Sequence, residues 1–224
     1  MHGAVRESRT GRPARMSAAF CLMVIVGASQ GTAQAIDVKL SVEEAKKALE
    51  AGRAPMEKAN TPEDVKKVLQ QASLATRVGS DPEKEPCGAS AILRTKRYRL
   101  EAFGRQEAAE SKKQKKDVRM PEEFIQKVVD MPNMEVEVQL CGDDEYFAEK
   151  ADVVFQQKGK NIAPIDISPA DRGRKNDGDG PAYRSRFTAR FAYDSFDPNA
   201  KTIVVVTLQD GQEIRFDADL SKVK

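Results

Sequence analysis

The side chains able to do chemistry in this chain are restricted in type. It holds one histidine, His2, and three cysteines, Cys21, Cys87 and Cys141. If residues 1–35 are removed as a secretory signal, no histidine and only two cysteines remain. A chain without histidine has no Ser-His-Asp or Cys-His catalysis and no imidazole ligand for a metal. The composition therefore predicts a protein that is not an enzyme and that uses no cofactor.

Residues 1–35 have the features of a secretory signal peptide. Separated arginines precede a short apolar run from Ala18 to Val26, and Ala33 and Ala35 supply the small residues of a cleavage site. The apolar run is shorter than the ~20 residues needed to span a bilayer, and a retained single membrane anchor is the alternative. We therefore expect an exported protein, periplasmic or extracellular, with no transmembrane span after cleavage.

The mature chain is expected to be close to electrically neutral. The whole chain has a formal net charge of +2, and the leader holds four arginines, Arg6, Arg9, Arg12 and Arg15, but a single acid, Glu7. The slight excess of basic residues therefore disappears with the leader. A near-neutral protein has no global attraction to nucleic acid or to an anionic membrane. No nucleic-acid partner is expected.

Cys87 and Cys141 are the cysteines that the mature chain retains. Outside the cytoplasm an even pair is most simply a disulfide, and two buried free thiols are the alternative. A bridge across a loop of this length stabilises a fold by about 4 kcal/mol in the chain-entropy model. Such a bridge also removes the thiol nucleophile.

Two stretches of the sequence, 91–103 and 183–193, interleave basic with apolar or aromatic residues, which is typical of strands. If the two strands were neighbours, their basic residues would form a positive face suited to an anionic polymer or a headgroup. The alternative is an ordinary solvated sheet face that is neutralised by acids elsewhere. The candidate binding face consists of Arg94, Lys96, Arg97, Arg99, Arg184, Arg186 and Arg190.

The densest acidic cluster, Asp143, Asp144 and Glu145, follows Cys141 directly. It is a candidate acid/base pair or calcium site, and the segment 176–180 looks like half of a calcium loop that lacks the closing glutamate. Strand neighbours point in opposite directions, so a solvated turn is the preferred interpretation of the acidic cluster. A flexible loop is preferred for 176–180.

Helices are expected mainly in the N-terminal half of the chain. Ser41 with Glu44 forms a capping box for a first helix, which Gly52 and Pro55 should end near Ala51. The second helix should begin at Pro62 with Thr61 as N-cap, and a short third helix should follow Pro121. The segment 112–116 is expected to be a solvated loop or a helix end.

The rest of the chain has the period-two alternation of β-strands. Strands are expected at 91–103, 134–140, 151–157, 183–193, 202–208 and 213–220, with an extended segment at 162–167 and a loop at 169–180. Asp210 and Gly211 predict a tight hairpin turn. The aromatic residues expected in the core are Tyr183, Phe187, Phe191 and Phe216. This pattern indicates an antiparallel β-sandwich, for which an immunoglobulin-like architecture is the nearest template.

The sequence therefore predicts a mainly β protein in three parts: a cleaved signal peptide at 1–35, a helical segment at 36–80 and a disulfide-linked β-sandwich at 81–224. The expected function is non-catalytic binding or scaffolding, with an envelope protein or an anionic polymer as partner. One alternative is a carboxylate-dependent enzyme such as a glycan hydrolase. The other is a structural subunit of an envelope assembly, which would show a large apolar surface patch.

Overall fold

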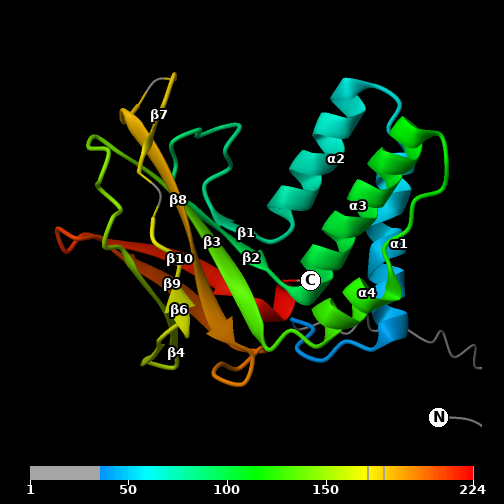
Figure 1. Ribbon diagram of the computed structural model, residues 1–224. Helices are drawn as coiled ribbons and strands as arrows, with labels where there is room; N and C mark the ends of the chain where they lie inside the picture. Colours follow the sequence, from blue (N-terminus) through cyan, green and yellow to red (C-terminus); the bar gives the residue numbers. More distant parts are fainter. Residues whose placement is uncertain (1–35, 171, 179, 224) are drawn as a thin grey trace, which may run out of the picture. The chain divides into compact units, whose positions relative to one another are not determined.

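The computed structural model describes residues 36–170, 172–178 and 180–223, so the predicted signal peptide lies outside the described residues. Two antiparallel β-sheets and a group of α-helices make up the described part (Figure 1). The helices are α1 (Val42–Lys58), α2 (Pro62–Leu74), α3 (Lys96–Gln114) and α4 (Glu122–Val129), followed near the C-terminus by a 3₁₀ turn at Leu220–Lys222.

The first sheet has the strand order β1-β2-β3-β8-β6, with β7 also paired to β8, and the second has the order β10-β9-β4-β5. The strands of the first sheet are β1 (Arg77–Gly79), β2 (Ser90–Arg94), β3 (Asn133–Gly142), β6 (Asp166–Ile167), β7 (Arg174–Lys175) and β8 (Tyr183–Ala192). Those of the second sheet are β4 (Asp152–Gln157), β5 (Lys160–Ile162), β9 (Lys201–Thr207) and β10 (Glu213–Asp219). Two antiparallel sheets were predicted, and the structure confirms them.

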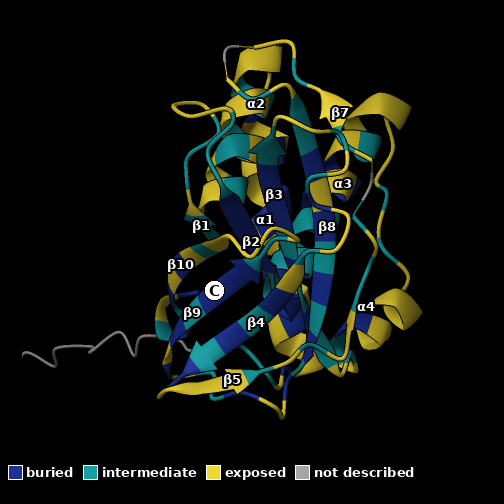
Figure 2. Cartoon of the chain, turned by 90° about the vertical axis from the view of Figure 1, so that its left-hand side faces the viewer, coloured by how far each residue is buried: buried dark blue, intermediate teal, exposed yellow. Residues whose placement is uncertain are grey.

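The main core lies between the two sheets. Alternate residues of β3 face it, and so do alternate residues of β8, because successive side chains of a strand point to opposite faces. Phe155 of β4 stacks on Phe191 of β8 with ring centroids 3.8 Å apart, which joins the two sheets directly. Figure 2 shows the buried residues along β3 and β9 in dark blue. Each large apolar side chain that is fully buried here stabilises the fold by about 1.5–3 kcal/mol.

The C-terminal hairpin follows the prediction. Strands β9 and β10 pair along their whole length, and Gly211 at the turn has φ +85°, a conformation that glycine adopts without strain. Of the four predicted core aromatics, Phe187, Phe191 and Phe216 are buried. Tyr183, the first residue of β8, is only half-buried.

Helix α1 is longer than predicted, since it continues through Gly52 and Pro55 to Lys58. Gly52 does not end the helix but allows it to approach α3: a Cβ at this position would lie 2.0 Å from the carbonyl oxygen of Glu101. Gly104 of α3 has the same role, because its Cβ would lie 1.9 Å from the carbonyl oxygen of Leu49. The two glycines therefore set the helix crossing.

The segment 91–103 was predicted to be one strand, and this is wrong. Strand β2 ends at Arg94, and the Thr95 hydroxyl accepts a hydrogen bond from the Tyr98 amide, which caps helix α3 at its N-terminus. The α-helices as a group hold about as many residues as the strands, so the described part is not mainly β. The short helix after Pro121 is confirmed as α4.

Helices α1, α3 and α4 share an apolar cluster that includes Leu49, Leu100, Ile125 and Val128. Helix α2 differs, because it has no buried residue, although Thr61 is its N-cap as predicted and forms a capping box with Asp64. No helix in the described ranges is long and apolar enough to cross a membrane.

Candidate functional site

The first sheet has an outer face, defined here by the residues that alternate with those of the main core. The strand register arranges these residues in four rows that run across the sheet. The rows are, in order, Cys141–Arg184–Arg174, then Ser90–Gln139–Arg186, then Arg77–Ile92–Glu137–Thr188, and last Arg94–Glu135–Arg190–Asp166. We call the first two the cationic rows and the last two the acidic rows.

The acidic rows are electrically balanced. Strand β3 contributes Glu135 and Glu137 to them, between the arginines of the neighbouring elements. Arg94 forms an ion pair with Glu137, Arg99 forms one with Glu135, and Nε of Arg190 lies 3.6 Å from a carboxylate oxygen of Glu135. Three of the predicted binding residues therefore pair with acids of the strand that separates β2 from β8, and Arg190 also pairs with Asp166 of β6 at 2.5 Å.

The cationic rows lack such acids. At the corresponding positions β3 carries Gln139 and Cys141, which are uncharged. Arg174 of β7 lies directly opposite Arg184 of β8, and Arg186 follows on the same face of β8. Like charges placed directly opposite each other on neighbouring strands are destabilising. Among the described residues, positive charge therefore accumulates at this end of the sheet.

A cavity of about 700 Å³ opens beside the cationic rows. We call it the basic cavity, and it is lined by Pro86, Arg172, Arg174, Lys175, Asn176, Asp177, Gly178, Arg184 and Arg186. Arg172 is neutralised by Glu145, to which it donates two hydrogen bonds of 2.7 Å. Within the described residues no ion pair is formed by Arg174, Lys175 or Arg186. Most of the positive charge of the cavity is therefore not compensated by the described residues.

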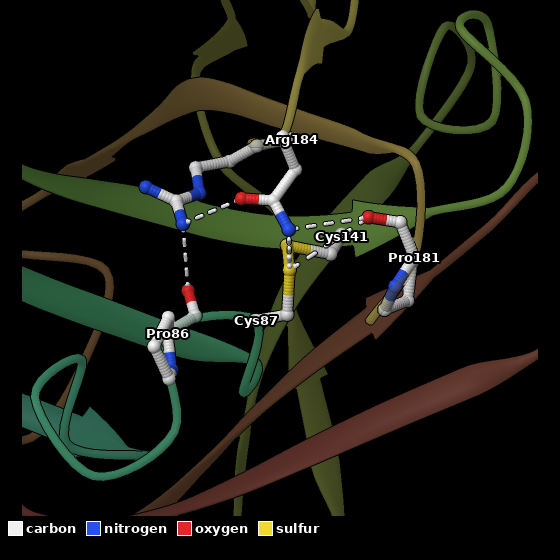
Figure 3. The surroundings of a disulfide bond; sticks show 6 residues. Pro86, Cys87, Cys141, Pro181 and Arg184 are labelled. Carbon is white, nitrogen blue, oxygen red and sulfur yellow. Dashed lines mark hydrogen bonds between the residues drawn. A yellow bond between two sulfur atoms is a disulfide. The ribbon is translucent and has the colours of Figure 1, made fainter. Parts of the chain in front are cut away.

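The predicted disulfide between Cys87 and Cys141 is present, and Figure 3 shows it beside Pro86 and Arg184, two residues that line the basic cavity. The bridge connects the segment before β2 to the end of β3. The side-chain amide of Asn176 donates to Sγ of Cys87 at 3.1 Å and to the carbonyl oxygen of Pro181 at 3.3 Å. The disulfide thus holds in place one of the residues that line the cavity.

Arg184 is held by neutral partners. Its guanidinium group donates to the carbonyl oxygen of Pro86 at 3.0 Å and to the side-chain oxygen of Asn176 at 3.2 Å (Figure 3). Its Nε is buried and has no hydrogen-bond partner in the part of the chain that the structure describes. Carbonyl groups orient a guanidinium but do not cancel its charge, so the described partners position Arg184 without neutralising it.

Arg77 lies in the next row, on β1. Burial lowers the pKa of Arg77, and the nearby cation of Arg186 adds to the lowering, whereas Glu137 opposes it. Arg77 donates hydrogen bonds to the hydroxyls of Ser90 and Ser73. It therefore forms the boundary between the cationic and the acidic rows.

The other predicted binding residues lie elsewhere. Lys96 is buried at the start of α3, where its amine donates to the carbonyl oxygen of Val129 at 2.6 Å. Arg97 forms an ion pair of 2.7 Å with Asp37. The predicted basic strand ladder is wrong for these residues and for Arg99, because all three lie on a helix. Of the seven predicted residues, the basic cavity brings together Arg184 and Arg186.

The acidic cluster is a turn, as preferred from the sequence. Asp143 and Asp144 are exposed, and Asp144 accepts a hydrogen bond of 2.8 Å from the Tyr146 amide, the pattern of an Asx turn. Together with Asp210 they line a second cavity of about 690 Å³. Among the described residues no group of three or more His, Cys, Asp or Glu side chains is arranged to hold a metal ion.

Sequence reasoning missed Arg174, Lys175 and Asn176, which it placed in a flexible loop at 169–180. In the structure Arg174 and Lys175 form β7, which pairs with the beginning of β8. The only sequence signal was a group of basic residues before a glycine-rich turn, with a strand after it. Such a pattern fits a hairpin as well as a loop.

The chain was compared with known proteins. No protein-family model matches it, and no curated protein is significantly similar to it. A functional proposal therefore rests on the geometry of the chain itself.

Proposed function

We propose that this protein is an exported, non-catalytic binding module of the cell envelope, which receives an anionic group of its partner in the basic cavity. One observation carries the proposal: the acidic rows of the outer face are paired, whereas Arg174, Lys175 and Arg186 have no acidic partner among the described residues. An anionic ligand would form charge-assisted hydrogen bonds with these side chains and remove their mutual repulsion.

The neutrality of the mature chain fits a local site. Because no global charge attracts anions, affinity must come from the few cations that converge in the cavity. We also propose that the two sheets form an immunoglobulin-like sandwich. Immunoglobulin variable domains bind their ligands through loops at one end of the sheets, and the basic cavity also lies at an end of the first sheet.

The proposal is tested by site-specific crosslinking in the producing cell. A photoreactive residue replaces Lys175 at the basic cavity or, as the matched control, the exposed Lys201 on the second sheet. We expect an adduct from position 175 that is absent from position 201, and we expect Arg186→Gln to reduce it. Equal adducts from both positions, or none from position 175, would contradict the proposal.

Two alternatives each have an observation in their favour. A carboxylate-dependent glycan hydrolase is favoured by the cavity that Asp143, Asp144 and Asp210 line. Glycan cleavage that is abolished by Asp143→Asn or Asp144→Asn would support it. A structural subunit is favoured by α2, where Leu69 is 50% and Leu74 is 45% exposed. A stable complex that is lost in Leu69→Ser would support that alternative.

A further inference from the structure

The charge of the basic cavity limits the class of ligand that fits it. Four lining cations, Arg174, Lys175, Arg184 and Arg186, have no ion pair with a described residue, and Asp177 is the one acid among the described lining residues. A single carboxylate brings one negative charge, whereas a phosphate monoester brings about 1.5 to 2 negative charges at neutral pH. The excess of cations among the described lining residues therefore matches a phosphoryl group better than a carboxylate.

The geometry of the arginines points the same way. Arg174 and Arg184 are directly opposite on neighbouring strands, so their Cβ atoms are about 5 Å apart. Arg186 extends from the same face two residues farther along β8. A carboxylate has two oxygens that lie in one plane, whereas a phosphoryl group presents three oxygens in different directions, which suits several guanidinium groups that converge from different positions.

Arg184 is also oriented before any ligand arrives. Its hydrogen bonds to Pro86 and Asn176 fix the guanidinium group, and the disulfide partner Cys87 in turn holds Asn176. A fixed side chain loses little conformational entropy when a ligand binds, which favours affinity. The site therefore has the order and the charge of a built anion site.

We infer that the basic cavity binds a phosphoryl group. This inference rests on the proposed function and names its ligand class. The phosphoryl group can belong to a soluble compound such as a sugar phosphate or to the headgroup of a phospholipid, and both would meet Arg174, Arg184 and Arg186 in the same way.

The experiment titrates the purified protein, with its disulfide intact, by calorimetry with inorganic phosphate and with glucose 1-phosphate. A parallel flotation assay uses vesicles of phosphatidylcholine with and without phosphatidic acid. We expect saturable binding that weakens at least tenfold, about 1.4 kcal/mol, in Arg174→Gln and in Arg186→Gln. Arg190→Gln is the matched control, since Arg190 lies on the same face of the same strand but is paired with Asp166.

The outcomes separate the source of the ligand and the two levels of the proposal. Binding of the soluble phosphates, or of vesicles with phosphatidic acid only, supports the inference and identifies a soluble or a lipid source. Binding of polygalacturonate without phosphates, lost in Arg186→Gln, overturns the phosphoryl inference and leaves the proposed function standing. Binding of none of these probes overturns the phosphoryl inference, and so does an equal loss in Arg190→Gln; crosslinking at position 175 then decides the proposed function. Thermal melting of each variant verifies that it is folded.

Discussion

Tyr193 and Lys96 lie where the first turn of α3 meets the main core. The Tyr193 hydroxyl accepts a hydrogen bond of 3.2 Å from the backbone amide of Lys96, and the Lys96 amine lies 5.1 Å from the centre of the tyrosine ring. Burial raises the pKa of Tyr193 to about 12 and lowers the pKa of Lys96. Both shifts favour the uncharged form, as expected for groups removed from water.

These shifts predict how stability changes in alkaline solution. The folded pKa of Tyr193 lies above its ordinary value, so its contribution to stability is complete below pH 10 and is lost as the pH rises toward 12. A shift of that size corresponds to about 3 kcal/mol. We expect urea unfolding to show this loss in the wild type and not in Tyr193→Phe.

Lys96 is the internal control of that experiment. The pKa of Lys96 is lowered in the folded protein. Its effect on the free energy of unfolding is therefore opposite to that of Tyr193: stability increases as the pH rises toward the ordinary lysine pKa of 10.5. The wild type and Tyr193→Phe share this contribution of Lys96. The difference between their pH dependences therefore reports the ionisation of the Tyr193 hydroxyl alone. Equal dependence on pH in the wild type and in Tyr193→Phe would contradict the assignment.

At the scale of elements, the crossing of α1 and α3 depends on two glycines. Gly52 and Gly104 each leave no room for a Cβ beside the backbone of the other helix. An alanine gains about 1 kcal/mol of helix propensity over glycine, whereas forcing atoms into a packed interface costs about 1–3 kcal/mol or more. We therefore expect both Gly52→Ala and Gly104→Ala to lower the free energy of unfolding, measured in urea.

Gly178→Ala is the control, because its Cβ would meet no atom closer than 4.0 Å and its φ is not positive. It should leave the free energy of unfolding nearly unchanged. If Gly52→Ala instead stabilised the protein, the helices would have to move apart easily, contrary to the contact described above.

The elements that sequence reasoning identified are those with a clear apolar period. Strand β3 alternates over its length and was predicted, whereas the beginning of α3, up to residue 103, was taken for part of a strand. Helix α3 buries charged side chains, among them Arg105 and Glu107, and Glu107 lies 3.4 Å from the buried Arg53 of α1. A helix that buries ion pairs has no apolar stripe, so its period is not visible in the sequence.

At the scale of the whole molecule, the disulfide between Cys87 and Cys141 closes a loop of 54 residues in sequence separation. A loop of that length corresponds to about 4 kcal/mol in the chain-entropy model. We expect the variant with both cysteines replaced by serine to lose stability of that order in urea unfolding. Its ligand affinity should also fall, because Asn176 loses its sulfur partner.

Reducing agent provides the control for this prediction. It should lower the stability of the wild type to that of the double variant and leave the double variant unchanged. If the wild type and the double variant unfolded at the same urea concentration, the bridge would have no part in stability.

The candidate site could be predicted only in part, because its charge depends on how the strands are arranged in the whole molecule. Arg184 and Arg186 were identified because they alternate with aromatic residues along one strand. Which arginines keep their charge uncompensated depends on β3, whose Glu135 and Glu137 lie between the two basic strands. This register is a property of the assembled sheet and cannot be read from either basic stretch alone.

The disulfide has a further consequence for a protein that meets proteases. Helices α3 and α4 both lie between the bridged cysteines, and the connection between them exposes Lys115 and Lys116. A single cut in this connection would divide the polypeptide into two pieces that remain covalently joined through the disulfide. One piece would carry β1 and β2 of the first sheet, and the other would carry the remaining strands of both sheets. Severing the backbone there would not release a fragment, so the nicked molecule would persist as a two-chain protein until a reductant reached it.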